Sequence, residues 1–173
     1  MNTFRIKAYA KINLGLDVLR RRPDGYHEVK MIMQSVRLHD VIEIARADEN
    51  AVFTDSLYVP NNRNNLAMRA ALLLQEETDM PQVSIRIKKN IPVSAGMAGG
   101  SSDAAAVLVG CNQLFDLGLS EQALMRLGAE IGSDVPFCVR GGTAIAEGRG
   151  ERIRSLPELP KMPVVLVRAD YGV

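Results

Sequence analysis

Apolar and polar residues alternate near the start of the chain. From Ile6 to Leu16 every second residue is apolar, and the residues between them include Lys11 and Asn13. A period of two is typical of a strand that buries one face. The pattern therefore predicts a strand over residues 4–19, with Lys11 and Asn13 on its polar face.

Similar patterns place further elements along the chain. Strands are predicted over residues 27–37, 41–47, 83–87, 135–139, 143–147, 151–155 and 163–168. The first two of these are joined near His39 and Asp40. The strands over residues 135–139 and 143–147 are expected to form a hairpin around Gly141 and Gly142. Helices are predicted over residues 65–78, 102–115 and 120–131, and residues 48–64 are polar and predict a loop. Strands and helices are mixed without a regular βαβ rhythm, which predicts an α+β domain with a mixed or antiparallel sheet.

The last part of the chain differs from the rest. A proline-rich stretch over residues 156–163 precedes the apolar run Val164–Val167. We expect one domain over residues 1–155, and a linker with the first strand of an otherwise absent second domain over residues 156–173. The alternative is an edge strand that returns to the main sheet. An exposed strand here would offer an edge for pairing with another chain.

Composition narrows the class of protein. The 173 residues are 47% hydrophobic and 24% charged, with a net charge of +1. These values are typical of a globular domain, and the charge gives no field that would favour nucleic acid or a membrane surface. The only cysteines, Cys111 and Cys138, lie in apolar contexts, which favours reduced thiols and a cytoplasmic location. The two histidines are far apart, which excludes a Cys/His metal cluster.

The most informative segment is a glycine-rich loop between residues 91 and 106. A strand-like stretch stops at Pro92, the loop contains Ser101 and Ser102, and an alanine-rich, helix-forming stretch follows. Glycines let a backbone approach a ligand closely, and a loop that ends at a helix N-terminus is a favourable place for a phosphate. The alternative is an ordinary turn with a serine N-cap. Such a cap needs fewer glycines and serines than this loop contains.

The loop does not match the commonest nucleotide and hydrolase motifs. No lysine follows its glycines as a Walker loop requires, and Ala98 interrupts the glycine spacing of a dinucleotide fingerprint. Asp103 and Ala104 after the serines exclude a hydrolase elbow. The loop therefore indicates a phosphate-handling enzyme of another class.

Three other positions could carry chemistry. Asp134 lies between a helix end and an apolar stretch, so it could orient a substrate hydroxyl or simply order a turn. Tyr26 and His27 follow a Pro-Asp-Gly turn and could stack on a planar ring or pack against the sheet. Lys11 could point into a cleft or into solvent.

Four segments, in this order, resemble the GHMP kinase superfamily. They are residues 10–16, 22–28, 91–105 and 132–137, and together they extend the resemblance over essentially the whole chain. The glycine-serine loop is common to the superfamily. The segments Asp24–His27 and Asp134–Phe137 resemble the members that act on a cytidyl-diphosphate sugar alcohol.

The resemblance implies a fold and a reaction. The fold would be an α+β sandwich like the second domain of ribosomal protein S5, with two layers of sheet and helices. The reaction would be ATP-dependent phosphorylation of a 2-hydroxyl in non-mevalonate isoprenoid (terpenoid) synthesis, with a small molecule as partner and neither nucleic acid nor membrane involved.

The resemblance also implies roles for single residues. Asp134 would orient the hydroxyl and accept its proton, and Lys11 would hydrogen-bond the same hydroxyl. The sugar alcohol would be held by Asn13, cytosine would be recognised by Tyr26 and His27, and Asn65 would lie near adenine. The ATP phosphates would be held by Pro92, Ser94, Ala95, Gly96, Met97, Ala98, Gly99, Gly100, Ser101 and Ser102. Mg²⁺ is expected with ATP, with Ser101 or Ser102 reaching it.

Two alternatives stay open at this point. One is a sibling kinase with a mevalonate-like or homoserine-like substrate, for which a stacking pair such as Tyr26 and His27 would have no purpose. The other is a non-catalytic module that keeps the loops as structure. Family members continue into a second domain that helps close the site, so binding without turnover is an expected outcome for this chain alone.

Overall fold

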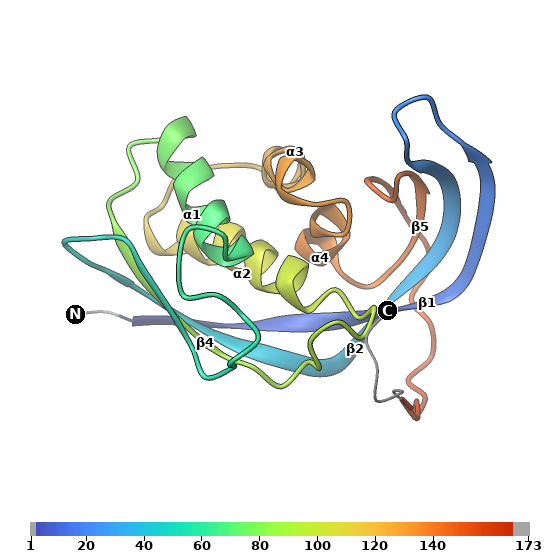
Figure 1. Cartoon of the computed structure of the whole chain (residues 1–173), viewed down its shortest axis with the longest axis horizontal. Helices are drawn as coiled ribbons and strands as arrows, with labels where there is room; N and C mark the ends of the chain where they lie inside the picture. Colours follow the sequence, from blue (N-terminus) through green and yellow to red (C-terminus); the bar gives the residue numbers. More distant parts are fainter. Residues whose placement is uncertain (1–2, 168–173) are drawn as a thin grey trace.

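The computed structural model describes residues 3–167, which form one sheet covered by helices on one face (Figure 1). The elements are β1 (Thr3–Arg21), β2 (His27–Arg46), β3 (Ala51–Thr54), α1 (Leu66–Glu77), β4 (Val83–Lys88), α2 (Gly99–Leu114), α3 (Glu121–Ile131), α4 (Val135–Arg140), β5 (Thr143–Gly148) and β6 (Arg152–Ser155). The α+β class predicted from the sequence is confirmed. No helix in the described range is long and apolar enough to cross a bilayer.

Strand β2 organises the sheet. One of its edges pairs antiparallel with β1, and its other edge pairs with β5 through residues 29–34 and with β4 through residues 41–46. With β3 parallel to β4 and β6 antiparallel to β5, the order is β3-β4-β2-β5-β6. Asp40 lies in β2 between the segments that pair with β5 and with β4. Its side chain accepts hydrogen bonds from the amides of Asn90 and Ile91, which follow β4 in the sequence.

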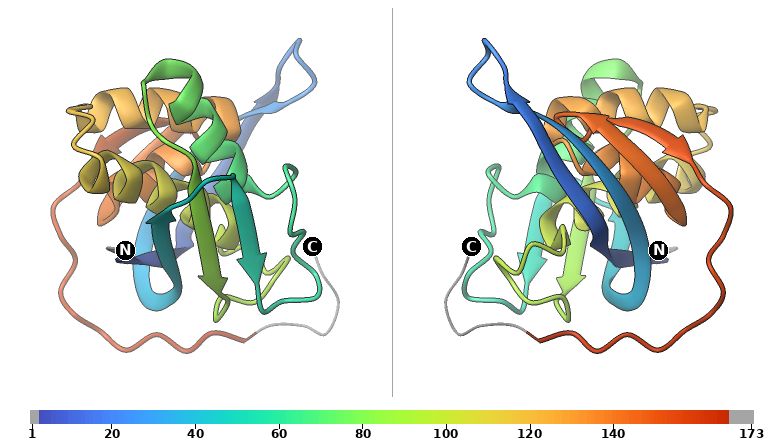
Figure 2. Two further views of the ribbon diagram at one scale, coloured as in Figure 1. Left: turned by 90° about the vertical axis from the view of Figure 1, so that its left-hand side faces the viewer. Right: turned by 90° about the vertical axis from the view of Figure 1, so that its right-hand side faces the viewer.

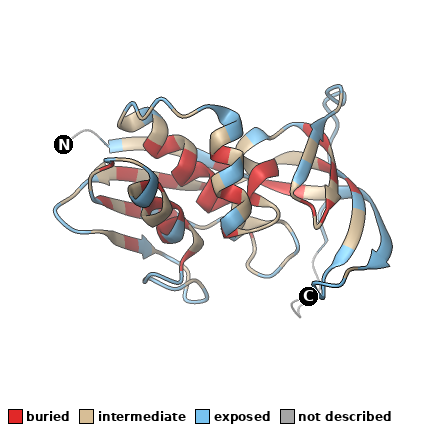
Figure 3. Ribbon diagram, turned by 90° about the horizontal axis from the view of Figure 1, so that it is seen from above, coloured by how far each residue is buried: buried red, intermediate tan, exposed pale blue. Residues whose placement is uncertain are grey.

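The core lies between the sheet and the helices, where the buried positions gather (Figure 3). Its fully buried side chains include Ile44 and Leu108, which come from β2 and α2. A Cβ on Gly110 of α2 would lie 2.7 Å from Ile44 Cδ1, so the helix packs very closely on the sheet. A smaller cluster around Met33 and Phe137 lies beneath α4.

The hairpin predicted from strands over residues 135–139 and 143–147 is wrong in its first strand. Residues 143–148 form β5 as expected, but residues 135–140 form helix α4. This apolar run is too short for its period to separate a strand from a helix. Proline is accepted in a first helical turn, and the helix buries Val135, Pro136 and Phe137.

Two strand boundaries also differ from the prediction. Residues 27–46 are one continuous strand rather than two, because β1 pairs with almost their whole length. The segment at residues 48–64, predicted as a loop, contains β3, which adds to β4 in parallel.

The strand predicted at residues 163–168 is not formed in its described part. Residues 156–167 carry no strand or helix and run as an extended segment away from the helices (Figure 2). Val165 and Val167 are almost fully exposed. A strand requires a neighbouring ladder of hydrogen bonds, and residues 156–167 pair with no strand of the described chain. Self-association through this segment stays a prediction.

Candidate active site

The N-terminus of α2 has unused hydrogen-bond donors. Its N-cap, Ala98, has φ 58° and makes no side-chain cap. The first bond of the turn runs from the Ser102 amide to the Ala98 carbonyl, and the amides of Gly99, Gly100 and Ser101 donate to no backbone carbonyl of the described residues. Free amides at the positive end of a helix of 16 residues form an anion site.

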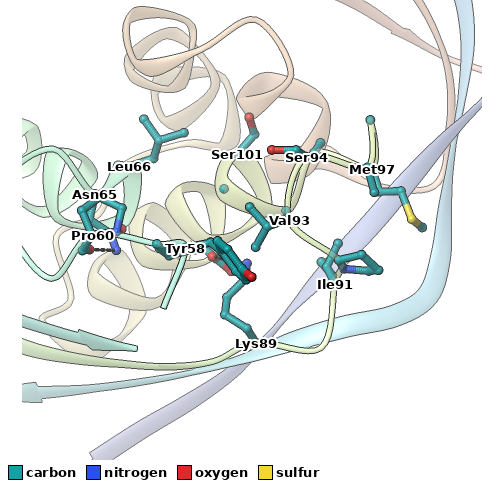
Figure 4. A pocket seen from close by; sticks show the side chains of 18 of the residues that line it. Tyr58, Pro60, Asn65, Leu66, Lys89, Ile91, Val93, Ser94, Met97 and Ser101 are labelled. Carbon is teal, nitrogen blue, oxygen red and sulfur yellow. Dashed lines mark hydrogen bonds and ion pairs between the residues drawn. The ribbon is translucent and has the colours of Figure 1, made fainter. Parts of the chain in front are cut away.

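A pocket of about 330 Å³ lies at this helix end (Figure 4). Its walls come from the loop before α1, the end of β4 and the glycine-rich loop. The lining residues are Tyr58, Val59, Pro60, Asn64, Asn65, Leu66, Lys89, residues 91–101 and Asp103. The residues expected from the sequence to hold ATP, with Ser102 excepted, are therefore brought together in one pocket.

The glycines of this loop differ in their backbone conformation and in their surroundings. Gly96 has φ +68°, a conformation that suits glycine, but Ser94 and Ala98 also have positive φ. Gly99 and Gly100 do not have positive φ, but side chains of other segments lie close to both of them. A Cβ at Gly99 would lie 3.3 Å from Lys89 Nζ, and one at Gly100 would lie 3.2 Å from the Leu66 side chain.

Ser102 faces away from the pocket. Its hydroxyl donates to the Tyr9 carbonyl at 2.6 Å and lies 3.4 Å from Cys138 Sγ, and the residue is buried. This hydroxyl therefore attaches α2 to β1. Of the two serines considered for the phosphates and for Mg²⁺, only Ser101 lines the pocket.

A second group of polar side chains, the Lys11 cluster, consists of Lys11, Asn13 and Asp134. Lys11 is only 5% exposed, and its Nζ lies 3.2 Å from Asn13 Oδ1 and 3.5 Å from Asp134 Oδ2. Asp134 precedes α4 but its side chain makes no cap bond, which argues against a purely structural role for this carboxylate. Its side chain is 28% exposed, so a ligand can reach it.

The Lys11 cluster adjoins the pocket. The Lys11 amide donates to the Met97 carbonyl in the glycine-rich loop at 3.2 Å, at a register shift in the β1–β2 pairing. Ser101 Oγ lies 3.8 Å from the position that a Cβ on Gly132 would take, two residues before Asp134. An anion at the α2 N-terminus and a hydroxyl at Asp134 would thus be neighbours.

A third group, the Lys89 cluster, was not found from the sequence. Lys89 Nζ donates to Asp40 Oδ2 and, at 2.8 Å, to Asp103 Oδ2, and all three side chains are at most 8% exposed. Asp103 Oδ1 has no hydrogen-bond partner among the described atoms, and burial, with neighbouring Asp40, raises the pKa of Asp103 to about 8. Burial lowers the pKa of Lys89, but the two carboxylates outweigh that effect and raise it. Lys89 and Asp103 of this cluster also line the pocket.

Tyr26 and His27 lie at the tip of the β1–β2 hairpin. The Tyr26 carbonyl accepts from the Arg22 amide at 2.8 Å, and its amide donates to Asp24 Oδ1 at 3.2 Å, which fixes the turn. The Tyr26 ring is 56% exposed, with the Arg149 guanidinium 5.1 Å from its centroid. An exposed, partly stacked aromatic ring is suited to bind a planar group.

Asn65 has a structural function in addition to lining the pocket. Its Oδ1 accepts from the Ala67 amide at 2.9 Å as the N-cap of α1, and its Nδ2 donates to the Pro60 carbonyl at 2.8 Å (Figure 4). It is only 3% exposed. The proximity to adenine expected for it stays a prediction.

Replacement of Asn65 by alanine is expected to lower the free energy of unfolding by about 1–2 kcal/mol, since it removes a helix cap and leaves the buried Ala67 amide without its acceptor. Urea denaturation followed by circular dichroism measures this loss. The neighbouring exposed Asn64→Ala is the matched control. An equal, small loss in both variants would contradict the capping role.

The chain shares this fold with known proteins. Residues 65–142 match the family model described as the GHMP kinases N terminal domain. A crystal structure of 4-(cytidine 5'-diphospho)-2C-methyl-D-erythritol kinase superposes with a TM-score of 0.74 at 38% identity, covering 88% of this chain and 55% of that one. The mevalonate kinase of Methanococcus jannaschii has a TM-score of 0.67 at 14% identity over 90% of this chain and 56% of that one, which shows the fold alone.

These matches define the class of fold: residues 65–142 match the N-terminal domain of GHMP kinases, and the chain has the fold of that domain. Among curated proteins it is 53% identical, over 98% of its own length, to a protein of Caldicellulosiruptor bescii. That relative is named 4-diphosphocytidyl-2-C-methyl-D-erythritol kinase. The chain spans about 60% of the relative's length.

Proposed function

We propose that the chain is the nucleotide- and acceptor-binding part of a kinase that transfers the γ-phosphoryl group of ATP to the 2-hydroxyl of 4-diphosphocytidyl-2-C-methyl-D-erythritol. The observation that carries the proposal is the uncapped N-terminus of α2 beside the Lys11 cluster. One site suits a phosphate chain, and the other suits a hydroxyl. The 53% identity to a kinase of that name supports the choice of substrate.

The geometry suggests how the residues divide the reaction. Phosphoryl transfer depends mainly on positioning and on stabilising charge. The α2 amides would hold phosphate oxygens, while Asp134 would accept a hydrogen bond from the attacking hydroxyl and Lys11 would offset the charge between them. A carboxylate is a much weaker base than an alkoxide, so Asp134 would orient the hydroxyl first and take its proton late in the transfer.

Mg²⁺ would enter the pocket with ATP. The described residues contain no group of three acidic, histidine or cysteine side chains that could hold a metal ion. An ion would therefore bind mainly to the phosphates, with the Ser101 hydroxyl as the protein ligand lining the pocket. When bound, it would neutralise charge on the phosphates.

Other parts of the proposal rest on fewer observations. The sibling kinase of mevalonate-like or homoserine-like substrates is less favoured, because the mevalonate kinase match is only 14% identical. The proposed division into a domain over residues 1–155 and the start of another over 156–173 is supported by Ser155 being the end of the last strand within residues 3–167. A cytoplasmic location agrees with Cys111 and Cys138 being free thiols.

Calorimetric titration tests the proposal. CDP and, separately, a non-hydrolysable ATP analogue with Mg²⁺ are added to the chain, with UDP and ADP-ribose as controls. We expect both CDP and the analogue to bind. His27→Ala should weaken the binding of CDP and leave that of the analogue unchanged. Binding of the analogue without preference for CDP over UDP would favour the sibling kinase, and binding of neither would favour the non-catalytic module.

A further inference from the structure

The turn between β5 and β6 lies between Tyr26 and Asp134. On one side, the Arg149 guanidinium stands 5.1 Å from the centre of the Tyr26 ring. On the other, a Cβ on Gly150 would lie 3.9 Å from Ser133 Cβ and 4.0 Å from Asp134 Oδ1. A ligand that reached from the exposed tyrosine to the carboxylate would therefore pass this turn.

Arg149 differs from the neighbouring cations in what its side chain binds. Lys11 is hydrogen-bonded to Asn13, and the side chains of Arg22 and Arg152 are both hydrogen-bonded to Glu28. The Arg149 guanidinium makes no hydrogen bond within residues 3–167, and the carboxylate paired with it, Glu151, is 4.0 Å away.

The Arg149 guanidinium lacks a hydrogen bond for a local reason. Glu151 Oε2 instead accepts the backbone amide of Arg149 at 2.7 Å, which closes the turn. Gly148 and Gly150 have φ of +77° and +113°, so the turn depends on glycine at both positions. The guanidinium is left stacked on Tyr26 with its side chain 35% exposed and its donors unused.

We infer that Arg149 binds the diphosphate of the substrate. The inference rests on the proposed function, because the name of that substrate places a cytosine base at one end, the alcohol at the other and a diphosphate between them. With the base on the exposed surface of Tyr26 and the 2-hydroxyl at Asp134, the diphosphate would lie beside the turn. A guanidinium binds phosphate oxygens through two parallel hydrogen bonds, and stacking on an aromatic ring holds it in place.

Arg149→Gln tests the inference because glutamine keeps a planar polar group but removes the charge. Arg154→Gln, on the exposed face of β6, is the control for the same change in net charge. Cytidine and CDP are titrated into the wild-type chain and into both variants. We expect Arg149→Gln to weaken the binding of CDP about 10-fold and to change the affinity for cytidine less than about two-fold. It should also make the binding of CDP less dependent on salt concentration. Arg149→Lys should recover part of the affinity, and Arg154→Gln should match the wild type.

Each outcome can be assigned. Equal weakening of cytidine and CDP would show that Arg149 acts only through the Tyr26 ring, and an unchanged affinity for CDP would show no role; either result overturns the inference and leaves the proposed function standing. Failure of the wild-type chain to bind cytidine and CDP would overturn both. Unchanged affinity of Arg149→Gln for the ATP analogue shows that the variant is folded.

Discussion

Replacement of Asp134 by asparagine is expected to lower kcat for phosphoryl transfer by about 10²–10⁴-fold, the range typical of lost general-base assistance. The substitution keeps the shape of the side chain and an oxygen near Lys11 Nζ, now 3.5 Å from the carboxylate. It removes the charge that would orient the hydroxyl and accept its proton. Steady-state release of ADP, in the protein that carries this domain, measures the change.

The same variant should bind the ATP analogue with unchanged affinity, because Asp134 does not line the phosphate pocket. Glu130→Gln, on the exposed surface of α3, removes a carboxylate nearby in the sequence and serves as the control. Loss of ATP binding with unchanged turnover would show that Asp134 has been assigned the wrong role.

Replacement of Lys89 by alanine is expected to lower the free energy of unfolding by about 3–5 kcal/mol, the cost typical of removing one partner of a buried ion pair. Asp40 and Asp103 would then be buried beside each other with no cation between them. Urea denaturation measures the loss, and the exposed neighbour Lys88→Ala should cost far less.

The effect of Lys89→Ala should depend on pH. The pKa of Asp103 is raised in the folded state, from 3.8 to about 8, so the folded state holds this proton over a pH range in which the unfolded state has lost it. The contribution of protonated Asp103 to the free energy of unfolding is therefore fully present at low pH and is lost as pH rises through about 8. The loss of stability in Lys89→Ala should be larger above pH 8, where Asp103 is charged, than well below pH 8, where Asp103 is protonated. A penalty that is equal at every pH would indicate lost packing alone.

The sequence predicts the elements in which one period continues for many residues. β1, α1 and α3 were placed within a few residues because alternation or helical spacing marks them. α4 was missed because a helix of six residues is too short to show its period. The continuity of β2 was missed because it depends on pairing with β1, which no local pattern records.

The candidate site divides in the same way. The glycine-rich loop, Lys11 and Asp134 were found because each belongs to a short motif. The Lys89 cluster was not found because its members are separated by 49 and 14 positions, and only the fold brings them together. The close contacts around Gly99 and Gly100 were likewise not predicted, since the side chains that lie next to them come from other segments.

The hydrogen bond from the Lys11 amide to the Met97 carbonyl connects the Lys11 cluster directly to the glycine-rich loop of the pocket. A nucleotide that orders the glycine-rich loop would also protect this amide against exchange with solvent deuterium, although Lys11 belongs to another segment. If nucleotide binding raises the affinity for the acceptor through this contact, acceptor binding raises the affinity for the nucleotide by the same factor, because such coupling is reciprocal. Slower exchange at a single backbone position would therefore report communication between the donor and acceptor sites before any phosphoryl group is transferred.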